Sequence, residues 1–276
     1  MRYFYLVWVI GLLFASGARA AGANEDIQLF DTHIHYSHDA WDQLPPKNAI
    51  SILRAAGIKW AFVSSSSDDG TQMLYREAPD LIVPVLRPYR QRGETRSWLN
   101  DPTILDHVSD RLKNNKYAGI GEFHAYGDDI EGEVMQGIIA LARQYDLFLH
   151  AHSDADAVRR IFRHYPQARV LWAHSGFDSP DDIRAVLEDH DTLWADLAFR
   201  SDHASGSSID PDWHALFEDF PDRFMLGTDT YTPERWPYIA AHADWSREWL
   251  ATLPPDLAEN IGYRNADRLI AKADEK

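Results

Sequence analysis

The chain alternates short apolar runs, rich in β-forming residues, with amphipathic segments of helical period. The runs that predict strands cover residues 27–32, 60–64, 81–86, 117–122, 147–150, 169–173, 192–197 and 224–228. Between them, "PKNAISILRAAG" ends in Gly57, which suits a helix C terminus, and "SDADAVRRIFRHYP" opens with a Ser-x-x-Asp capping pattern. "SPDDIRAVLEDH" places a proline and acidic residues in its first turn, which also favours a helix start.

Eight predicted strands, separated by roughly 20 to 35 residues with helical connections, are what a (β/α)8 barrel of about 250 residues requires. An open, doubly wound sheet shows the same alternation and is the alternative. No low-complexity segment or linker interrupts the pattern, so we expect residues 21–276 to form a single (β/α)8 barrel domain. The most loop-like stretch is "SDHASGSSIDP" at 201–211, directly after a predicted strand.

Residues 1–20, "MRYFYLVWVIGLLFASGARA", have the pattern of a secretory signal peptide. A basic start at Arg2 precedes an apolar stretch over residues 3–14, and small residues end at Ala18-Arg19-Ala20. The apolar stretch is shorter than the roughly 20 residues of a membrane span, although a retained N-terminal anchor is the competing interpretation. No later segment is apolar enough to span a membrane, so we expect a soluble protein in the periplasm or outside the cell, without membrane attachment once the signal is cleaved.

Composition narrows the classes of function. The chain of 276 residues has a hydrophobic fraction of 45%, enough for a packed core, and contains no cysteine, which excludes thiolate ligands and cysteine nucleophiles. Its formal net charge is −16, and loss of Arg2 and Arg19 with the signal would make it about −18, which argues against nucleic acids and anionic membranes as partners. A small-molecule substrate remains, and the oligomeric state is open, a homo-oligomer included.

Candidate ligands fall at the ends of five predicted strands. They are His33 and His35 on the first strand, Glu122 on the fourth, His150 on the fifth, His174 on the sixth and Asp229 on the eighth. In a parallel barrel all carboxyl ends of the strands lie on one face, where active sites are built, so these residues should converge.

Imidazole and carboxylate groups together indicate a divalent metal site. Alternation along a strand would let His33 and His35 face the barrel axis together. Such ligands suit zinc, which we favour, or manganese, iron or nickel, with one or two ions per chain. A metal lowers the pKa of water toward neutrality, and a neighbouring aspartate can take the proton and pass it to the leaving group. Taken singly, each residue has a plainer interpretation: a His-x-His pair is usually incidental, and Asp229 could cap the helix that begins near Thr232.

The combination of motifs resembles the amidohydrolase superfamily of metal-dependent hydrolases. "DTHIH", "LHAH", "WAHSG" and "GTD" match it on strands one, five, six and eight, and the C-terminal "AENIGYRNADRLI" is similar to the closing helix of the amidohydrolase-related branch, which also contains decarboxylases and lactonases. The resemblance covers essentially all of the chain after the signal and is specific for the superfamily, but weak for the substrate.

The resemblance implies roles for the candidate ligands. It makes His33, His35 and His150 metal ligands, Asp229 a ligand that shuttles protons, and His174 either a ligand of a second metal or an orienting catalytic group. "GIGEFH" resembles the version of strand four in which a glutamate, here Glu122, bridges two metals; one metal remains if Glu122 does not ligate. His150 and His152 would face the same way, and we favour His150 as the ligand because it ends the apolar run.

Several residues near strand ends are candidates for substrate binding. Arginines could hold an anionic group in a bidentate manner: Arg87 and Arg90 follow the third strand, and Arg200, close to Asp196 and His203, follows the seventh. Structural salt bridges are the alternative for each arginine. His152 is expected to support a metal ligand or to contact the substrate. The residues expected to line the entrance are Tyr36, His38, Trp41, His124 and Tyr126. Of these, His38 is interpreted as a loop residue that does not bind the metal.

Three functions compete on these observations. The favoured one is an exported hydrolase that uses metal-activated water to cleave a C–O or C–N bond of a small, anionic substrate: an ester, lactone or amide, with phosphoesters included. The second is a mononuclear, non-oxidative decarboxylase of an unsaturated or aromatic acid, which cavity-facing arginines would favour. The third is a periplasmic metal-binding protein without catalysis, which a ligand-saturated metal would favour.

Overall fold

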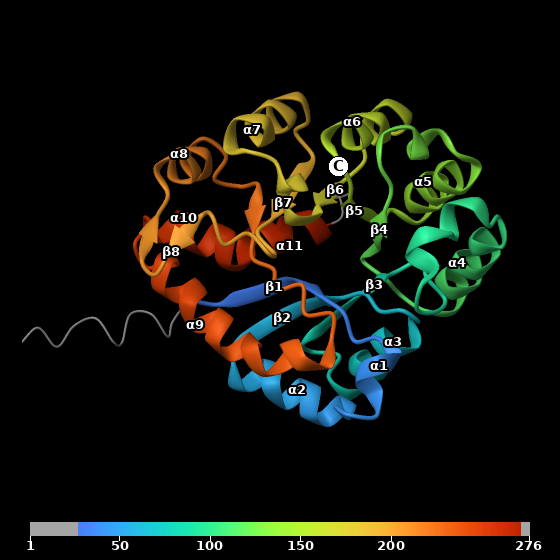
Figure 1. The fold of residues 1–276 in the computed structure, drawn as a ribbon, viewed down its shortest axis with the longest axis horizontal. Coiled ribbons are helices and arrows are strands. Elements are labelled where there is room, and N and C mark those ends of the chain that lie inside the picture. The colour runs from blue at the N-terminus through green and yellow to red at the C-terminus, as the bar shows by residue number, and fades with distance from the viewer. Residues whose placement is uncertain (1–26, 272–276) are drawn as a thin grey trace, which may run out of the picture.

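Eight parallel strands form a nearly closed barrel within residues 27–271, the part of the chain that the computed structural model describes (Figure 1). In chain order, which is also their order around the barrel, they are β1 (Leu29–Ile34), β2 (Ile58–Val63), β3 (Ile82–Leu86), β4 (Gly119–His124), β5 (Phe148–His152), β6 (Val170–Trp172), β7 (Leu193–Asp196) and β10 (Phe224–Met225). The N–H of Thr32 donates to the carbonyl of Leu226 at 2.9 Å, and that of His35 to Thr230 at 2.8 Å. These bonds join the first strand to the last, so the predicted (β/α)8 barrel is confirmed and the open sheet is excluded.

The helices lie outside the strands and connect them in the predicted order (Figure 1). They are α1 (His38–Trp41), α2 (Pro46–Ala55), α3 (Asp69–Glu77), α4 (Thr103–Asn114), α5 (Glu133–Tyr145), α6 (Ala155–His164), α7 (Pro180–Asp189), α8 (Pro211–Asp219), α9 (Ile239–Leu250), α10 (Pro255–Glu259) and α11 (Asn265–Ile270). Short helical turns η1 (Glu94–Arg96), η2 (Trp98–Asn100), η3 (Gly127–Glu131), η4 (Ala173–Phe177), η5 (Pro233–Tyr238) and η6 (Asn260–Arg264) lie in the connections.

Two of the three helix ends predicted from local signals are correct, and one of them is the end of α2, which Gly57 follows with a φ of 68°. Pro180 occupies the first turn of α7, whose N-cap Ser179 accepts from the N–H of Asp182. The cap predicted for α6 is wrong by one residue, because Asp154 rather than Ser153 accepts the N–H of Ala157, at 2.8 Å. The loop predicted at 201–211 contains a short antiparallel hairpin, β8 (Ala204–Ser205) and β9 (Ser208–Ile209).

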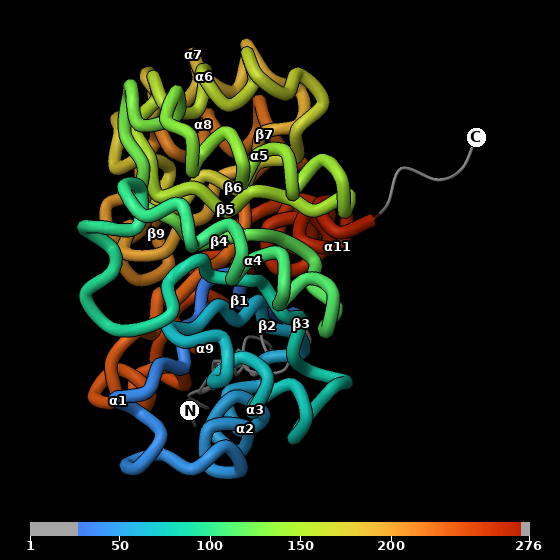
Figure 2. The backbone as a smooth tube through the Cα atoms, turned by 90° about the vertical axis from the view of Figure 1, so that its right-hand side faces the viewer, coloured from blue at the N-terminus to red at the C-terminus, as the bar shows by residue number. Residues whose placement is uncertain are grey.

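The barrel interior is filled at its amino-terminal end by a compact apolar cluster. Each strand except β4 contributes one large side chain: Phe30, Phe62, Val85, Phe148, Leu171, Trp194 and Met225. Ala266 and Leu269 of α11 complete this cluster, and Figure 2 shows α11 at one end of the barrel with the β9 loop toward the other. The larger cluster lies between the strands and the helices around them. The C-terminal helix therefore closes the barrel bottom, and the opposite end remains for polar residues.

Two glycines on the inner face make room for neighbours. A Cβ on Gly119 would meet the Phe148 ring at 2.6 Å, so β4 contributes space rather than a side chain to the apolar cluster. A Cβ on Gly227 would meet the Cβ of His33 at 2.9 Å. The absence of side chains at these positions lets Phe148 and His33 pack inside the barrel.

Buried neutral histidines outside the barrel should make the fold sensitive to acid. Both ring nitrogens of His203 lie among aromatic rings, with Trp249 at 5.0 Å and Trp245 at 5.1 Å, and find no hydrogen-bond partner among the described residues. Burial lowers the pKa of His203, and that of His242, to about 4. Because the unfolded chain protonates near pH 6.5, stability should be full above that pH and fall as the pH drops toward 4, by up to about 1.4 kcal/mol per pH unit for each histidine.

Urea unfolding at pH 7, 6 and 5 would measure this dependence. We expect His203→Phe, which keeps an aromatic ring and removes the titrating group, to flatten the slope between pH 6.5 and 4. An unchanged slope in this variant would show that His203 is not a source of the acid sensitivity.

The signal peptide predicted for residues 1–20 lies outside the described residues. Within 27–271, none of the helices combines the length and the apolar character needed to cross a membrane.

Candidate metal centre

Two histidines at the carboxyl end of β1 point into the barrel toward the same pair of carboxylates. Nε2 of His35 lies 3.2 Å from Glu122 Oε2 and 3.2 Å from Asp229 Oδ1. Nε2 of His33 lies 3.5 Å from Glu122 Oε1 and 3.7 Å from Asp229 Oδ1. The strands therefore bring together residues that are almost 200 positions apart in the chain, and the expectation that His33 and His35 face the axis together is met.

The other ring nitrogen of each histidine is held by a fixed acceptor. Nδ1 of His35 lies 2.5 Å from the carbonyl oxygen of Ser64, which can only accept, so this nitrogen carries the proton. Nδ1 of His33 lies 3.0 Å from Asp196 Oδ2. Each imidazole is thus oriented with Nε2 toward Glu122 and Asp229.

Glu122 stands at the centre of the cluster. Its Oε2 accepts from Arg87 Nη2 at 2.7 Å, and its backbone carbonyl accepts from Arg87 Nε at 3.2 Å. Its Oε1 lies 2.7 Å from His152 Nδ1 and 3.6 Å from His174 Nε2. Glu122 therefore contacts side chains at the carboxyl ends of β1, β3 and β5 and in η4.

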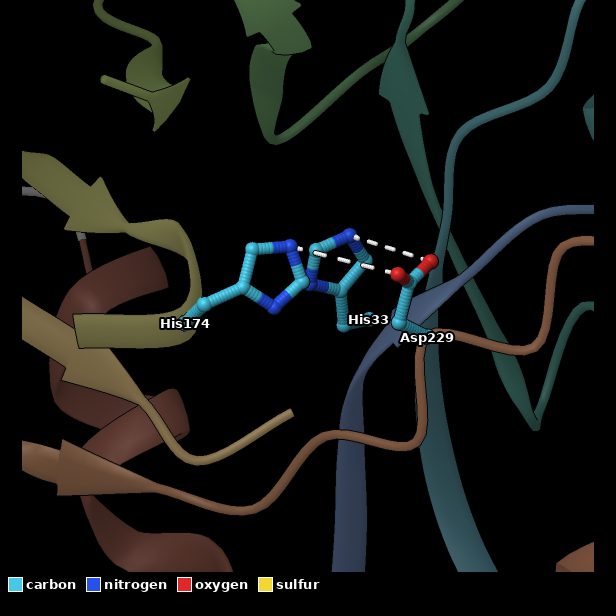
Figure 3. A group of neighbouring side chains, drawn as sticks. All are labelled: His33, His174 and Asp229. Atoms are coloured by element: carbon cyan, nitrogen blue, oxygen red, sulfur yellow. Dashed lines mark ion pairs between the residues drawn. The ribbon is translucent and has the colours of Figure 1, made fainter. Parts of the chain in front are cut away.

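His174 of η4, which follows β6, and Asp229, which follows β10, complete the ring of polar groups. Their side chains point toward each other and toward His33, with His174 Nε2 3.9 Å from Asp229 Oδ2 (Figure 3). Both residues have left-handed backbone conformations, with φ of 56° for His174 and 43° for Asp229. Such conformations are unfavourable for residues with a Cβ and cluster at functional sites.

The two histidines of β5 lie at different depths. Phe148, His150 and His152 all face inward, and Phe148 belongs to the apolar cluster, so the strand rises from the core to the cavity. His150 is buried with its Nε2 3.2 Å from Asp196 Oδ2, whereas His152 lies beside Glu122 and lines the cavity. The geometry thus places His152, rather than the favoured His150, with the exposed part of the cluster; His150 and Asp196 form a buried group with His33 below it.

Asp196 is the functional candidate whose role the sequence did not reveal. This fully buried carboxylate accepts from both His33 and His150 through Oδ2, and from the backbone N–H groups of His174 and Ala198 through Oδ1 at 2.8 and 3.0 Å. The sequence feature that could have identified Asp196 is its position at the carboxyl end of β7, a strand that contributes no other candidate ligand. Asp31, within β1, links this strand to the segment after β10, since its Oδ2 accepts from Thr228 Oγ1 at 2.8 Å.

The electrostatics of the cluster favour anionic carboxylates. Burial alone would raise the pKa of Glu122, but the charges of His33 and Arg87 hold it well below the usual range. Burial opposes ionisation of Asp229 in the same way, and His33 and His35 lower its pKa. Burial would lower the pKa of His33, yet Asp196, Asp229 and Glu122 together raise it well above 6.5. The site therefore concentrates negative charge and attracts a cation at its centre.

This donor set fits a divalent metal ion. The Nε2 atoms of His33 and His35 are buried and have no hydrogen-bond partner among the described residues, although carboxylates face them. Buried polar atoms without partners are rare in folded proteins and commonly indicate a ligand or ion. Groups of side chains that lie close enough to share an ion include His33–His35–Glu122 and His33–His174–Asp229. Nitrogen and carboxylate ligands of this kind suit zinc and similar ions.

A cavity of about 750 Å³ opens directly above the cluster. His35, Glu122, His152 and Asp229 lie at its floor, and Arg87 and His124 at its side. The cavity is large enough for a small organic substrate. Solvent and substrate therefore have access to the candidate metal ligands.

The predicted substrate contacts differ in their access to this cavity. Arg87, His124 and His152 line it. Arg200 does not: its guanidinium donates to Asp202 and to the carbonyls of His174 and Asp178, and it lies 4.7 Å from the centre of the Trp213 ring. This arrangement argues against the substrate contact predicted for Arg200 and supports its structural alternative.

Residues predicted to line the entrance also separate into two groups. Tyr36 and Trp41 pack inward, where Tyr36 donates to the Leu44 carbonyl at 2.5 Å. His38 lines the cavity outside the metal cluster, and the ring of the exposed Tyr126 lies 6.1 Å from that of His152.

Comparisons with known proteins agree with the fold. An uncharacterised TIM-barrel protein from Bordetella bronchiseptica superposes with a TM-score of 0.62 at 15% identity, over 88% of this chain and 98% of that one. The TatD homologue YjjV from Escherichia coli K12 gives 0.59 at 17%, over 88% and 98%. A protein from Acinetobacter baumannii, described as a probable 2-pyrone-4,6-dicarboxylic acid hydrolase, gives 0.58 at 12%, over 88% and 99%. No curated protein matches the sequence significantly.

Fold and site together define a (β/α)8 barrel with a buried histidine–carboxylate cluster at the carboxyl ends of its strands, whose donor atoms could hold a metal ion. The family model described as amidohydrolase matches residues 98–271, more than half of the chain, and the protein belongs to this family. The predicted resemblance is confirmed. Members of the family are generally metal-dependent, and membership supports a hydrolase or a related enzyme.

Proposed function

We propose that the protein is an exported metal-dependent hydrolase that cleaves a C–O or C–N bond of a small ester, lactone or amide. The observation that carries this proposal is the convergence of the buried Nε2 atoms of His33 and His35 on Glu122 and Asp229 at the floor of an open cavity. Export rests on the pattern of residues 1–20.

The chain's own groups divide the chemical work. His33, His35, Glu122 and Asp229 would hold the metal, with His174 and His152 on the side of Glu122 where a second ion could bind. A divalent ion in this cluster would lower the pKa of water and polarise the bond to be cleaved. Asp229 would take the proton from water and return it to the leaving group, because its carboxylate faces the cavity and is partly exposed there.

Two other functions make different predictions for the same site. Storage of metal without catalysis requires saturated coordination, whereas the cluster here opens onto a cavity large enough for a substrate. Decarboxylation by a single ion is favoured by one contact: the ion pair of Arg87 with Glu122 Oε2 at 2.7 Å competes with ligation by that oxygen. Two bound ions per chain would therefore favour the hydrolysis that we propose, whereas one bound ion is compatible with either reaction.

Metal analysis of the mature protein tests the proposal. Protein recovered from the periplasm or culture medium, with its N terminus checked by intact mass, should contain about one or two divalent ions per chain. His35→Ala should lose metal, while His214→Ala, on the exterior helix α8, should not. Metal-free protein after chelator-free, anaerobic purification, with no ion taken up on titration with Zn²⁺ or Mn²⁺, would contradict the metal centre.

A further inference from the structure

An arginine-rich loop between β3 and α4 forms part of the cavity lining. Arg92, Gly93, Thr95 and Arg96 of this loop line the same cavity as Asp229 and Glu122. The loop thus places two guanidinium groups at the mouth of the site, in a protein whose formal net charge is −16. Cations concentrated at one wall of an otherwise acidic protein favour an anionic ligand there.

Arg90 holds this loop in place and is not available to a ligand. Its guanidinium donates to Glu94 Oε1 at 2.9 Å, to Thr103 Oγ1 at 2.8 Å and to Asp101 Oδ2 at 2.5 Å, while its N–H donates to Glu94 Oε2 at 2.6 Å. Glu94 is itself buried. Both ends of the loop are therefore fixed, so Arg92 and Arg96 are presented to the cavity by an ordered segment.

The cavity arginines differ in how far their charges are already neutralised. Arg87 forms a short ion pair with Glu122, and Arg92 makes a long contact of 3.7 Å with Asp39. Arg96 makes no ion pair or side-chain hydrogen bond with any residue in 27–271. Arg96, with Arg92 beside it in the loop, can therefore accept a new anionic partner without first losing a strong one.

Exposed aromatic rings also border the site. Tyr231 lines the cavity, and the Phe199 ring lies 6.1 Å from it. Phe177 stacks on His174 at 4.6 Å, and Tyr126 lies 6.1 Å from His152. Of the five large hydrophobic side chains exposed among the described residues, these four border the metal cluster. Exposed apolar groups gathered at one place indicate a binding surface.

We propose that the substrate is a small amphipathic acid. Its anionic group would bind Arg96 and Arg92, and its aromatic or other apolar group would pack against Tyr231 and the neighbouring rings. The bond to be cleaved would lie between the two groups, over the cluster at the cavity floor. This inference rests on the proposed function and adds a substrate class to it. Bidentate binding by arginine supplies the specificity for the acid, and the rings supply apolar contact.

Equilibrium binding of non-reacting probes tests this division of the site. The probes are 4-phenylbutyrate, its uncharged amide and butyrate, titrated into metal-loaded protein and followed by ligand-observed NMR. We expect 4-phenylbutyrate to bind about 10-fold more tightly than either of the other two, because only it has both a carboxylate for the arginines and a phenyl ring for the aromatic side chains. Equal affinity for the acid and the amide would overturn the anionic part, and equal affinity for 4-phenylbutyrate and butyrate the apolar part.

Paired variants distinguish binding of the acid by Arg96 from direct binding of the acid to the metal. Arg96→Gln should weaken 4-phenylbutyrate about 5- to 10-fold and leave the amide unchanged, whereas Tyr231→Ala should weaken both by a similar factor. Arg163→Gln on α6 and Tyr238→Ala, an exposed tyrosine outside the cavity lining, are the matched controls and should match the unaltered protein. An Arg96→Gln protein that binds the acid as the Arg163→Gln protein does would overturn the inference.

The binding result is independent of turnover. Hydrolysis of uncharged esters by a protein that does not distinguish the acid from the amide would leave the proposed function standing and reject the substrate class. Conversely, discrimination between the probes by a protein that hydrolyses no ester, lactone or amide would reject the proposed function and retain the binding preference.

Discussion

Replacing Asp229 with asparagine should lower turnover by about 10²- to 10⁴-fold, the usual contribution of a general base, while leaving much of the metal bound. Asparagine preserves the size of the side chain and one oxygen, so the contact that Oδ1 makes with His35 at 3.2 Å can survive. It cannot accept a proton at neutral pH, so the transfer from water to the leaving group is lost. The expected signature is low turnover at near-normal metal content.

The measurement compares the rate of hydrolysis with metal content in the same preparations, using the best substrate from a panel of esters, lactones and amides. Asp191→Asn, at a fully exposed side chain outside the cavity lining, is the control for general effects of losing a carboxylate. Full activity in the Asp229→Asn protein would exclude the proton shuttle. Loss of both metal and activity would instead assign Asp229 the role of an essential ligand.

The barrel could be predicted because its signals are local. Each strand is a short apolar run followed by polar residues, and each connection has helical period, so eight repetitions leave few architectures. The strand ends differed by at most three residues, as for β10, which ends at Met225 rather than 228, and β5, which continues through His152 although its apolar run ends earlier. The wrong cap of α6 has a similar cause: Ser153 and Asp154 are adjacent capping residues, and backbone geometry decides between them.

The candidate site could be predicted only as far as strand ends determine position. His33, His35, Glu122, His174 and Asp229 meet because parallel strands end on one face. The sequence did not show how deep each histidine of β5 lies inside the barrel. His150 and His152 share a face of the strand, but His150 lies next to the apolar cluster that contains Phe148, and only His152 reaches the cavity. The roles of the arginines also depend on distant partners. Arg200 donates to Asp202 and packs on the Trp213 ring, whereas Arg96, which was not predicted as a substrate contact, lines the cavity.

Asp196 offers the sharpest test of how the buried layer supports the metal centre. Its Oδ2 lies 3.0 Å from His33 Nδ1 and 3.2 Å from His150 Nε2, while its Oδ1 accepts two backbone N–H groups. The charges of His33 and the hydrogen bonds of His150 and His33 overcome the effect of burial and hold the pKa of Asp196 below its usual range. Once a metal displaces the Nε2 proton of His33, this anionic acceptor would keep the remaining proton on Nδ1 and direct the Nε2 lone pair at the metal.

Asp196→Asn should weaken metal binding by about 10- to 100-fold, the range typical of losing a group that orients a ligand. If the asparagine oxygen stays with the backbone N–H groups, its NH2 faces His33 Nδ1 and His150 Nε2. In the neutral ring, the asparagine NH2 would then face the proton on His33 Nδ1, and two donors cannot share a hydrogen bond. The proton therefore shifts to Nε2, the atom that should bind metal. Titration of metal against a competing chelator measures the affinity, and ¹⁵N shifts of the His33 ring report the tautomer.

The tautomer measurement separates positioning from general destabilisation. At alkaline pH, where the raised pKa of His33 no longer keeps the metal-free ring doubly protonated, we expect its single proton to move from Nδ1 to Nε2 in the Asp196→Asn protein while the urea unfolding transition remains cooperative. Asp182→Asn in α7, outside the barrel interior, should alter neither the metal affinity nor the ring shifts. Unchanged metal affinity together with an unchanged tautomer in the Asp196→Asn protein would show that the buried carboxylate does not position His33, and that Glu122 and Asp229 alone orient the metal-facing side of the ring.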